Sequence, residues 1–256
     1  MKRSRASNLN RGLVGAWCPS VSGSGLLLPD LSGYGNHGTL TNMDASDWVG
    51  TDRGRALDFD GVNDFVSISA ARLPPGAAPW TISLWEFPTA FGAGNFGTSI
   101  SWGSGSLYQS VILANNGSGG DGKILVGQYG RNVLTTTTAR PLNQWTHTAI
   151  VYTGGTDLKA FQNGLLNGQG PISDAFNITV TAGAIGRFHE GTQRYTGQLD
   201  DIRLYNRALS PSEIKQLYEG GPGYGLRQER KRSRFQVQGF NAGRFRRQQL
   251  IGSGVY

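Results

Sequence analysis

Short stretches of alternating apolar and polar residues recur along most of the chain, each bounded by Gly, Asn, Asp or Ser. In WTISLWEF (80–87), Ile82 and Leu84 fall on one face of an extended segment and polar or aromatic residues on the other. The dipeptide Asn163-Gly164 separates two such stretches and favours the type I′ turn of a tight hairpin. The pattern predicts an all-β, two-sheet antiparallel sandwich.

One stretch near the C-terminus has the period and the end signals of a helix instead. Ser210 is a good N-cap, Pro211 suits the first helical position, and Glu213 completes a capping box with Ser210. Gly220 and Gly221 then provide a C-terminal stop. The sequence therefore predicts one short C-terminal helix after the last strand.

Charge divides the chain into three parts. Residues 1–11 hold four Lys or Arg and no acid, a charge of +4, whereas residues 12–220 hold 12 basic and 16 acidic residues, a charge of −4. Residues 221–256 hold eight basic residues and one acid, a charge of +7, so the three parts sum to the total of +7. We predict a mildly acidic sandwich over 12–220, a basic N-terminal arm over 1–11 and a basic tail over 221–256.

The tail combines charge with apolar residues and follows neither helical nor strand periodicity. Its composition is too apolar for a purely solubilising segment, so we expect it to dock on other protein chains of a large assembly. Alternatives are a disordered basic tail and non-specific contact with nucleic acid. The residues predicted to dock are Arg230, Arg232, Arg234, Phe235, Phe240, Phe245, Arg246, Arg247, Leu250 and Ile251.

Cellular location is only partly constrained by the sequence. The single cysteine, Cys18, excludes an intramolecular disulfide and is expected to be a buried thiol beside Trp17. The basic N-terminus is not followed by the apolar segment of a secretion signal, and no apolar run is long enough to cross a membrane. We therefore expect no membrane partner and no secretion signal in this chain.

Catalytic patterns are missing from the sequence. Paired carboxylates at period-two spacing, which glycosidases of sandwich folds use, do not occur, and the adjacent Asp200 and Asp201 would point to opposite faces of a strand. Glu86 is isolated, and His147 shares a predicted strand face with apolar residues. We predict that the chain is not an enzyme, with glycoside hydrolysis as an alternative if remote acids converge.

Residues 90–130 combine loop aromatics with amides, the side chains that bind sugars. Aromatic faces stack on sugar rings, and amides form hydrogen bonds with hydroxyl groups. The predicted ligand-binding residues are Asn95, Trp102, Tyr108, Asn115 and Asn116.

Three segments resemble the laminin-G-like, concanavalin-A-like jelly-roll family: LDFDGVNDFVSIS (57–69), QWTHTAIVY (144–152) and GQLDDIRLYNRALSPSEIKQLY (197–218). The resemblance covers about residues 12–220 and implies a jelly-roll sandwich. Members of that family bind sugars, bind proteins or build surfaces. The C-terminal RRQQLIGSGVY also resembles the C-termini of tailed-phage structural proteins.

The same resemblance implies a structural calcium site. The loop PDLSGYGNHGTLTN (29–42) carries the family's D-x-S-G-x-G-N-x-G pattern, and similar proteins hold Ca²⁺ between this loop and a carboxylate of the D-D-[IV]-R strand. Carried over, the ligands are Asp30, Gly33, Asn36 and Asp201. The alternative is that Asp30 caps a turn while one of the two adjacent aspartates forms an ion pair with Arg203 or Arg207.

Taken together, the sequence predicts a non-catalytic structural or adhesive module that displays a lectin-like domain on a virion, as a phage capsid decoration or tail-associated protein anchored by its arms. The alternative is a free carbohydrate-binding module of a larger extracellular system, which would bind a cell-surface or other polysaccharide.

Overall fold

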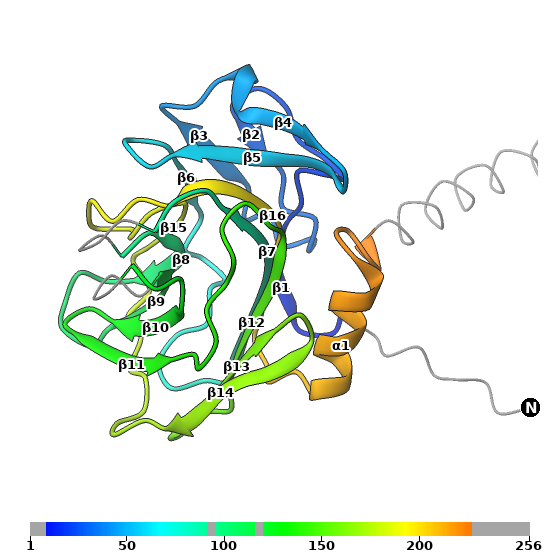
Figure 1. Cartoon of the computed structure of the whole chain (residues 1–256). Coiled ribbons are helices and arrows are strands. Elements are labelled where there is room, and N and C mark those ends of the chain that lie inside the picture. The colour runs from blue at the N-terminus through cyan, green and yellow to red at the C-terminus, as the bar shows by residue number, and fades with distance from the viewer. Residues whose placement is uncertain (1–8, 92–95, 116–119, 227–256) are drawn as a thin grey trace, which may run out of the picture.

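The computed structural model describes residues 9–91, 96–115 and 120–226. Within them, two antiparallel sheets stack face to face and one α-helix packs on the outside (Figure 1). This confirms the all-β jelly-roll sandwich with a short C-terminal helix. The tail residues predicted to dock, 230–251, lie outside the described residues.

Sheet A holds eight strands. Their order is β14 (Leu165–Pro171), β13 (Asp157–Gln162), β12 (Thr146–Tyr152), β7 (Trp80–Pro88), β16 (Thr196–Tyr205), β5 (Gly54–Asp60) and β4 (Trp48–Thr51), with β1 (Leu13–Trp17) also paired to β16. The first half of β16 pairs with β5 and the second half with β1, and a β-bulge between Asp200 and Arg203 marks the change of partner.

Sheet B also holds eight strands. Their order is β11 (Arg131–Thr135), β10 (Ile124–Gln128), β9 (Ser110–Asn115), β8 (Thr98–Gly103), β15 (Ala182–Ile185), β6 (Phe65–Ile68), β3 (Gly38–Thr41) and β2 (Leu27–Leu28). A single 3₁₀ turn, η1 (Ala45–Asp47), precedes β4. The predicted hairpin turn joins β13 to β14, and both Asn163 and Gly164 have the positive φ of a type I′ turn.

The main core lies between the sheets and follows the predicted alternation. Ile82 and Leu84 point inward from β7 and are fully buried. Trp80 packs edge-on against Trp102 of sheet B, with ring centroids 5.4 Å apart, which ties the two layers together. Inward residues of adjacent strands thus form one continuous apolar layer.

A second, smaller core lies between the outer face of sheet A and α1 (Pro211–Gly220). The capping box predicted for Ser210 and Glu213 is present, and Ile214 and Leu217 bury the inner side of the helix. Both ends of the described chain enter this core, because Leu9 and Leu226 are 5% and 7% exposed. The packed domain therefore extends beyond the predicted limits of 12 and 220.

Among the described residues, no helix has the length and apolar character needed to cross a membrane. Cys18 is a free, fully buried thiol, as predicted.

Candidate functional site

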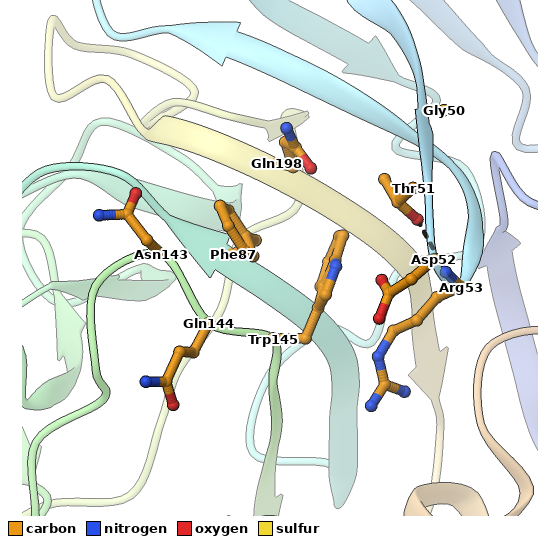
Figure 2. A pocket seen from close by; sticks show the side chains of 9 residues that line it. All are labelled: Gly50, Thr51, Asp52, Arg53, Phe87, Asn143, Gln144, Trp145 and Gln198. Carbon is orange, nitrogen blue, oxygen red and sulfur yellow. Dashed lines mark hydrogen bonds between the residues drawn. The ribbon is translucent and has the colours of Figure 1, made fainter.

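The part of the outer face of sheet A that α1 leaves uncovered contains an open groove of about 480 Å³ (Figure 2). We call it the Trp145 groove. It combines two aromatic rings, three amide side chains, one carboxylate and one guanidinium. Its lining residues are Gly50, Thr51, Asp52, Arg53, Phe87, Asn143, Gln144, Trp145 and Gln198.

The centre of the groove is a row of side chains across three neighbouring strands. Gln198 of β16 stands opposite Phe87 of β7, and Trp145 directly precedes the β12 residue that pairs with Glu86. The rings of Phe87 and Trp145 lie 5.5 Å apart at 54°. Glu86 faces the other sheet, so strand alternation turns the next residue, Phe87, to the outer face. Gln198 and Trp145 lie beside Phe87 on the neighbouring strands and therefore face the same way.

Two chain segments form the walls of this row. Asn143 has a φ of 56°, a left-handed conformation that asparagine tolerates, and its N–H donates to the Pro88 carbonyl at 2.9 Å. On the other side, the turn between β4 and β5 carries Asp52 and Arg53, and the Arg53 guanidinium lies 4.0 Å from the centre of the Trp85 ring.

Close contact between β16 and β7 is needed beside the groove. Gly197 has a φ of 123°, and a Cβ atom there would clash with the carbonyl oxygen of Phe87. Any other residue would push apart the two strands that carry Gln198 and Phe87.

Chemically, the groove suits a flat polar ring. Phe87 and Trp145 are partly exposed and offer ring faces, while the amides of Asn143, Gln144 and Gln198 offer hydrogen bonds in both directions. Only one of its lining residues is a carboxylate, so the groove holds no pair of carboxylates.

Sequence reasoning missed this groove. Nothing in the sequence shows that residues near 52, 87, 144 and 198 meet. The aromatic pair itself could have indicated the groove. Phe87 and Trp145 continue the outward-facing positions of β7 and β12 beyond the part of sheet A that α1 covers.

The predicted ligand-binding set is wrong at two positions. Trp102 is 0% exposed in the main core and its Nε1 donates to the Pro74 carbonyl, so its ring cannot be a platform. Asn115 is 2% exposed, and its Oδ1 accepts a hydrogen bond from Arg140. Tyr108 is 47% exposed, whereas Asn95 and Asn116 lie outside the described residues.

Glu86 lies in a buried network between the sheets rather than in a cleft. Its carboxylate accepts from Arg140 Nη1 at 2.6 Å, Thr148 Oγ1 at 2.6 Å and Ser99 Oγ at 2.7 Å. This buried carboxylate accepts from three donors and forms a structural ion pair with Arg140. Glu86 therefore has neither the access nor the partner of a catalytic acid.

Asp30 organises its loop through hydrogen bonds to both carboxylate oxygens. Oδ1 accepts from the N–H groups of Ala16 and Ser32, and Oδ2 accepts from the Ser32 hydroxyl and the Asn36 N–H, all within 2.9 Å. Asn36 in turn donates to the Val14 carbonyl. Gly33, in the same loop, has a φ of 91°. Protein N–H and O–H groups thus donate to both carboxylate oxygens of Asp30 and hold the loop in place.

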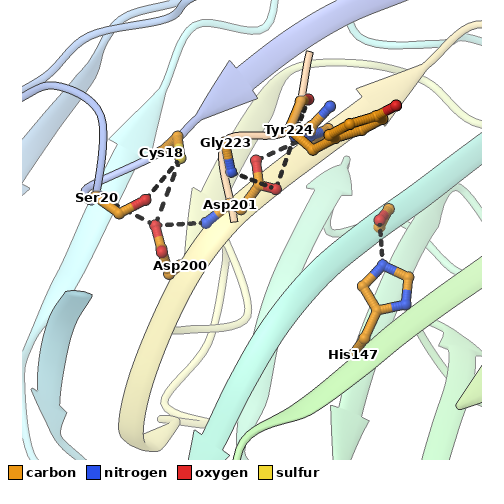
Figure 3. Close-up of polar contacts among 9 residues, drawn as sticks. Cys18, Ser20, His147, Asp200, Asp201, Gly223 and Tyr224 are labelled. Atoms are coloured by element: carbon orange, nitrogen blue, oxygen red, sulfur yellow. Dashed lines mark hydrogen bonds and ion pairs between the residues drawn. The ribbon is translucent and has the colours of Figure 1, made fainter. Parts of the chain in front are cut away.

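Asp201 forms the ion pair that the sequence left as an alternative (Figure 3). Its two oxygens accept from Arg203 Nε and Nη2, each at 2.8 Å, and the Gly223 N–H also donates to it. Asp201 has a φ of 49° within the β16 bulge, so strand alternation no longer decides where the two adjacent carboxylates point.

These residues do not fit a shared calcium site. Asp30 forms a β-bridge with Trp17 on one edge of β1, whereas Asp201 lies on β16, which pairs with the opposite edge of β1. Strand β1 therefore lies between the two residues. Both carboxylates already accept several N–H or O–H donors. Among the described residues, no three His, Cys, Asp or Glu side chains converge as metal ligands. Calcium binding stays a prediction from the resemblance alone.

His147 is the buried core histidine that the sequence predicted. It is 1% exposed, and its Nε2 lies 2.9 Å from Ser83 Oγ (Figure 3). Its ring packs on Trp85 and on Tyr218 of α1. Burial lowers its pKa from 6.5 to about 3, so it is neutral at physiological pH.

The family profile described as the concanavalin A-like lectin/glucanases superfamily matches residues 59–215. Among curated proteins, the adhesion G-protein coupled receptor V1 of Danio rerio is 31% identical over 185 residues. That match covers 66% of this chain but only 3% of the receptor.

Solved structures agree in fold. Domain 4 of AbnA, a GH43 extracellular arabinanase of Geobacillus stearothermophilus solved with arabinotriose, matches 80% of this chain and 97% of its own, with a TM-score of 0.61 and 21% identity. The binding domain of botulinum neurotoxin DC, solved in complex with SialylT, matches 82% of this chain and 52% of its own, with a TM-score of 0.59 and 11% identity. At such identities the likeness concerns the fold.

Proposed function

The chain belongs to the concanavalin A-like lectin/glucanases superfamily, and from that membership we propose that it is a non-catalytic module that binds carbohydrate in the Trp145 groove. The observation that carries the proposal is the row Gln198–Phe87–Trp145, in which two partly exposed rings adjoin an amide on one open sheet face. Sugar rings have an apolar face and a rim of hydroxyls, which this combination complements.

The groove's openness points to an oligosaccharide or polysaccharide rather than a small enclosed ligand. About 480 Å³ is accessible from the outer face, and the walls come from a hairpin turn and a loop rather than from a lid. Arg53 is held over Trp85 and Asp52 is exposed beside it, so the groove carries no net charge and favours neutral glycans.

Related proteins support a role outside the cell. The arabinanase is extracellular by description and its domain was solved with arabinotriose, and the zebrafish protein is an adhesion receptor. Because this chain spans a small part of the receptor, these roles support only the class of function: extracellular recognition of glycan by a non-catalytic domain.

Display on a larger assembly such as a virion is the second candidate. The charge of +7 on residues 221–256, against −4 on residues 12–220, favours an anchoring tail that carries the module. In this arrangement the sandwich binds glycan and the tail holds other protein chains.

The test is binding of a glycan panel that includes arabino-oligosaccharides and sialyllactose. We expect Trp145→Ala to weaken binding at least tenfold, about 1.4 kcal/mol, because the ring face is removed from an open groove. Tyr34→Ala is the matched control, because Tyr34 is 51% exposed and does not line the groove. Equal binding by wild type and Trp145→Ala contradicts the assignment, and release of shortened products contradicts a purely binding role.

A further inference from the structure

The hairpin that joins β15 to β16 (Figure 1) carries two arginines on its opposite strands. Arg187 and Arg194 form an antiparallel β-bridge, and residues directly opposite each other in such a pair extend their side chains to the same face. Both guanidiniums lie over the ring of Phe65 on β6, at 3.5 Å and 5.5 Å from its centre. We call Arg187 and Arg194 the arginine pair.

No carboxylate balances the charge of the arginine pair. In the part of the chain that the structure describes, neither guanidinium forms an ion pair or a hydrogen bond. Like charges directly opposite each other on neighbouring strands repel, and burial, followed by the charge of Arg194, lowers the pKa of Arg187. Four other arginines of the domain are each paired with a carboxylate: Arg131, Arg140, Arg203 and Arg207.

The nitrogen atoms of the pair divide into buried and accessible donors. Arg187 Nε and Arg194 Nε and Nη1 are buried without a partner, so they do not contact a ligand. The other nitrogens, both Nη atoms of Arg187 and Nη2 of Arg194, are neither hydrogen-bonded nor buried, and both side chains are partly exposed. The pair therefore offers the forked end of one guanidinium and a further charged donor from the second.

These donors complement an oxyanion. A guanidinium fork matches two oxygens of a carboxylate or sulfate, and hydrogen bonds between charged partners are about twice as strong as those between neutral groups. The Phe65 ring supports the Arg187 guanidinium from one face, which orients its fork before a ligand arrives. An anion also offsets the repulsion between the two arginines, whereas a neutral hydroxyl group does not. The pair therefore selects for negative charge.

The arginine pair lies close to the Trp145 groove along the chain. Arg194 is four residues before Gln198, which lines the groove, so the Cα atoms of these two residues are at most about 14 Å apart. An oligosaccharide of a few units spans such a distance. This closeness favours a saccharide over an unrelated small ion as the bearer of the negative charge.

We propose that the arginine pair is a second saccharide contact, which binds the carboxylate or sulfate group of an acidic sugar. The oxyanion accepts hydrogen bonds from the Nη atoms of Arg187 and from Nη2 of Arg194. That the anion belongs to a sugar rests on the proposed function; that the site takes an oxyanion rests on the arginine pair.

The test titrates ¹⁵N-labelled full-length protein with three sugars that differ only in the substituent at C6: galactose, galacturonic acid and galactose 6-sulfate. Sodium acetate and sodium sulfate, at matched ionic strength, show how tightly the bare ions bind. Backbone amide shifts of residues 186–195 report the arginine pair, and those of residues 143–146 report the Trp145 groove.

Two variants remove one charge each, Arg187→Gln and Arg194→Gln. Because they act independently, the second provides a route to the answer if the first does not fold. Arg72→Gln is the matched control, since the Arg72 guanidinium lies alone over the ring of Tyr34, 5.9 Å from its centre. It removes the same charge from another aromatic ring.

We expect at least one acidic sugar to shift amides 186–195 in wild type, in Trp145→Ala and in Arg72→Gln, with binding at least tenfold weaker in Arg187→Gln and Arg194→Gln. Which of the two sugars responds identifies the oxyanion as carboxylate or sulfate. Galactose and the bare ions should bind there at least tenfold more weakly, and added salt should weaken the binding of the acidic sugar.

The inference is overturned if neither acidic sugar shifts amides 186–195, if galactose or the bare ions bind there as tightly, or if both pair variants bind as well as wild type. Loss of glycan-panel binding in Trp145→Ala with no response at 186–195 rejects the arginine pair alone. A response at 186–195 with panel binding unchanged in Trp145→Ala rejects the Trp145 groove alone.

Discussion

Asp200 is a carboxylate held almost out of solvent at the junction of β1 and β16. It is 2% exposed, and its Oδ1 accepts from the N–H groups of Ser20 and Asp201 and from the Cys18 thiol (Figure 3). Burial, and then the charge of Asp201, raise its pKa from 3.8 to about 7. Burial also raises the pKa of the Cys18 thiol, so that group stays protonated beside it.

This raised pKa predicts a pH-dependent cost to stability. Between pH 3.8 and about 7 the folded state binds the Asp200 proton and the unfolded state does not, so the stability that this group contributes falls as pH rises through that window. We expect the free energy of unfolding of Asp200→Asn, taken relative to that of wild type, to increase by about 4 kcal/mol from pH 4 to pH 8. Urea unfolding of both proteins at several pH values measures the difference.

The comparison with the variant is needed because buried histidines act in the opposite direction. The pKa of His147 is lowered to about 3 and that of His189 to about 4, so both make the fold less stable as pH falls below 6.5. These contributions are common to wild type and Asp200→Asn and cancel in the difference. A difference that does not change with pH would show that Asp200 ionises normally in the folded protein.

Asp201 and Arg203 form a buried pair whose loss should be costly. Asp201→Asn suits the φ of 49°, since asparagine tolerates this conformation, but it leaves the fully buried Arg203 guanidinium without its counter-charge. We expect a loss of about 3–5 kcal/mol in urea unfolding. We also expect EDTA to leave the Tm of wild type unchanged, because the carboxylates of Asp30 and Asp201 already accept hydrogen bonds from protein donors. A lower wild-type Tm in EDTA would restore the calcium site.

At the scale of elements, α1 depends on its N-terminal cap. Ser210 Oγ accepts from the Glu213 N–H, Glu213 accepts in return from the Ser210 N–H at 2.9 Å, and Arg207 pairs with the Glu213 carboxylate at 2.7 Å. These contacts fix the start of the helix that covers the second core. The cap thereby links a local sequence pattern to the packing of sheet A.

We expect Ser210→Ala to destabilise the protein by about 1 kcal/mol, a decrease in Tm of about 2–4 °C for a domain of this size. Ser210→Gly is the matched variant, because glycine is also a good N-cap and should cost only a few tenths of a kcal/mol. Thermal unfolding followed by circular dichroism measures both. Equal losses in the two variants would mean that the hydroxyl is not what stabilises this helix.

The sequence predicted those elements whose formation depends on residues that are close together in the chain. The alternation around Ile82 and Leu84, the Asn163-Gly164 turn and the Ser210 cap each lie within a few residues. The Trp145 groove was not predictable in the same way, because its row joins residues 87, 145 and 198, which register brings together. Trp102 was misassigned because a loop-rich neighbourhood in sequence says little about whether a side chain points between the sheets.

At the scale of the whole molecule, the two ends of the described chain meet at the same place. Leu9 and Leu226 both pack into the core beneath α1, and the segment after the helix is tied to β16 by two further contacts. The Gly223 N–H donates to Asp201 at 3.0 Å, and Arg203 donates to the Tyr224 carbonyl at 2.8 Å. The division of charge along the sequence predicts a domain limit at 220, which leaves this packed segment outside the domain.

Two truncations separate the packed segment from the basic tail. Deleting 221–256 removes the buried Leu226 side chain and the donor to Asp201, so we expect a loss of about 3 kcal/mol or more in urea unfolding. Deleting only 227–256 keeps both, and we expect its stability and its glycan binding to equal those of the full chain.

If the tail is the anchor that its Phe and Arg residues predict, this shorter deletion should fold and bind glycan yet fail to join its assembly. Equal stability of the two truncations would mean that residues 221–226 do not belong to the packed domain, and normal incorporation of the 227–256 deletion would mean that the sandwich itself makes the contact.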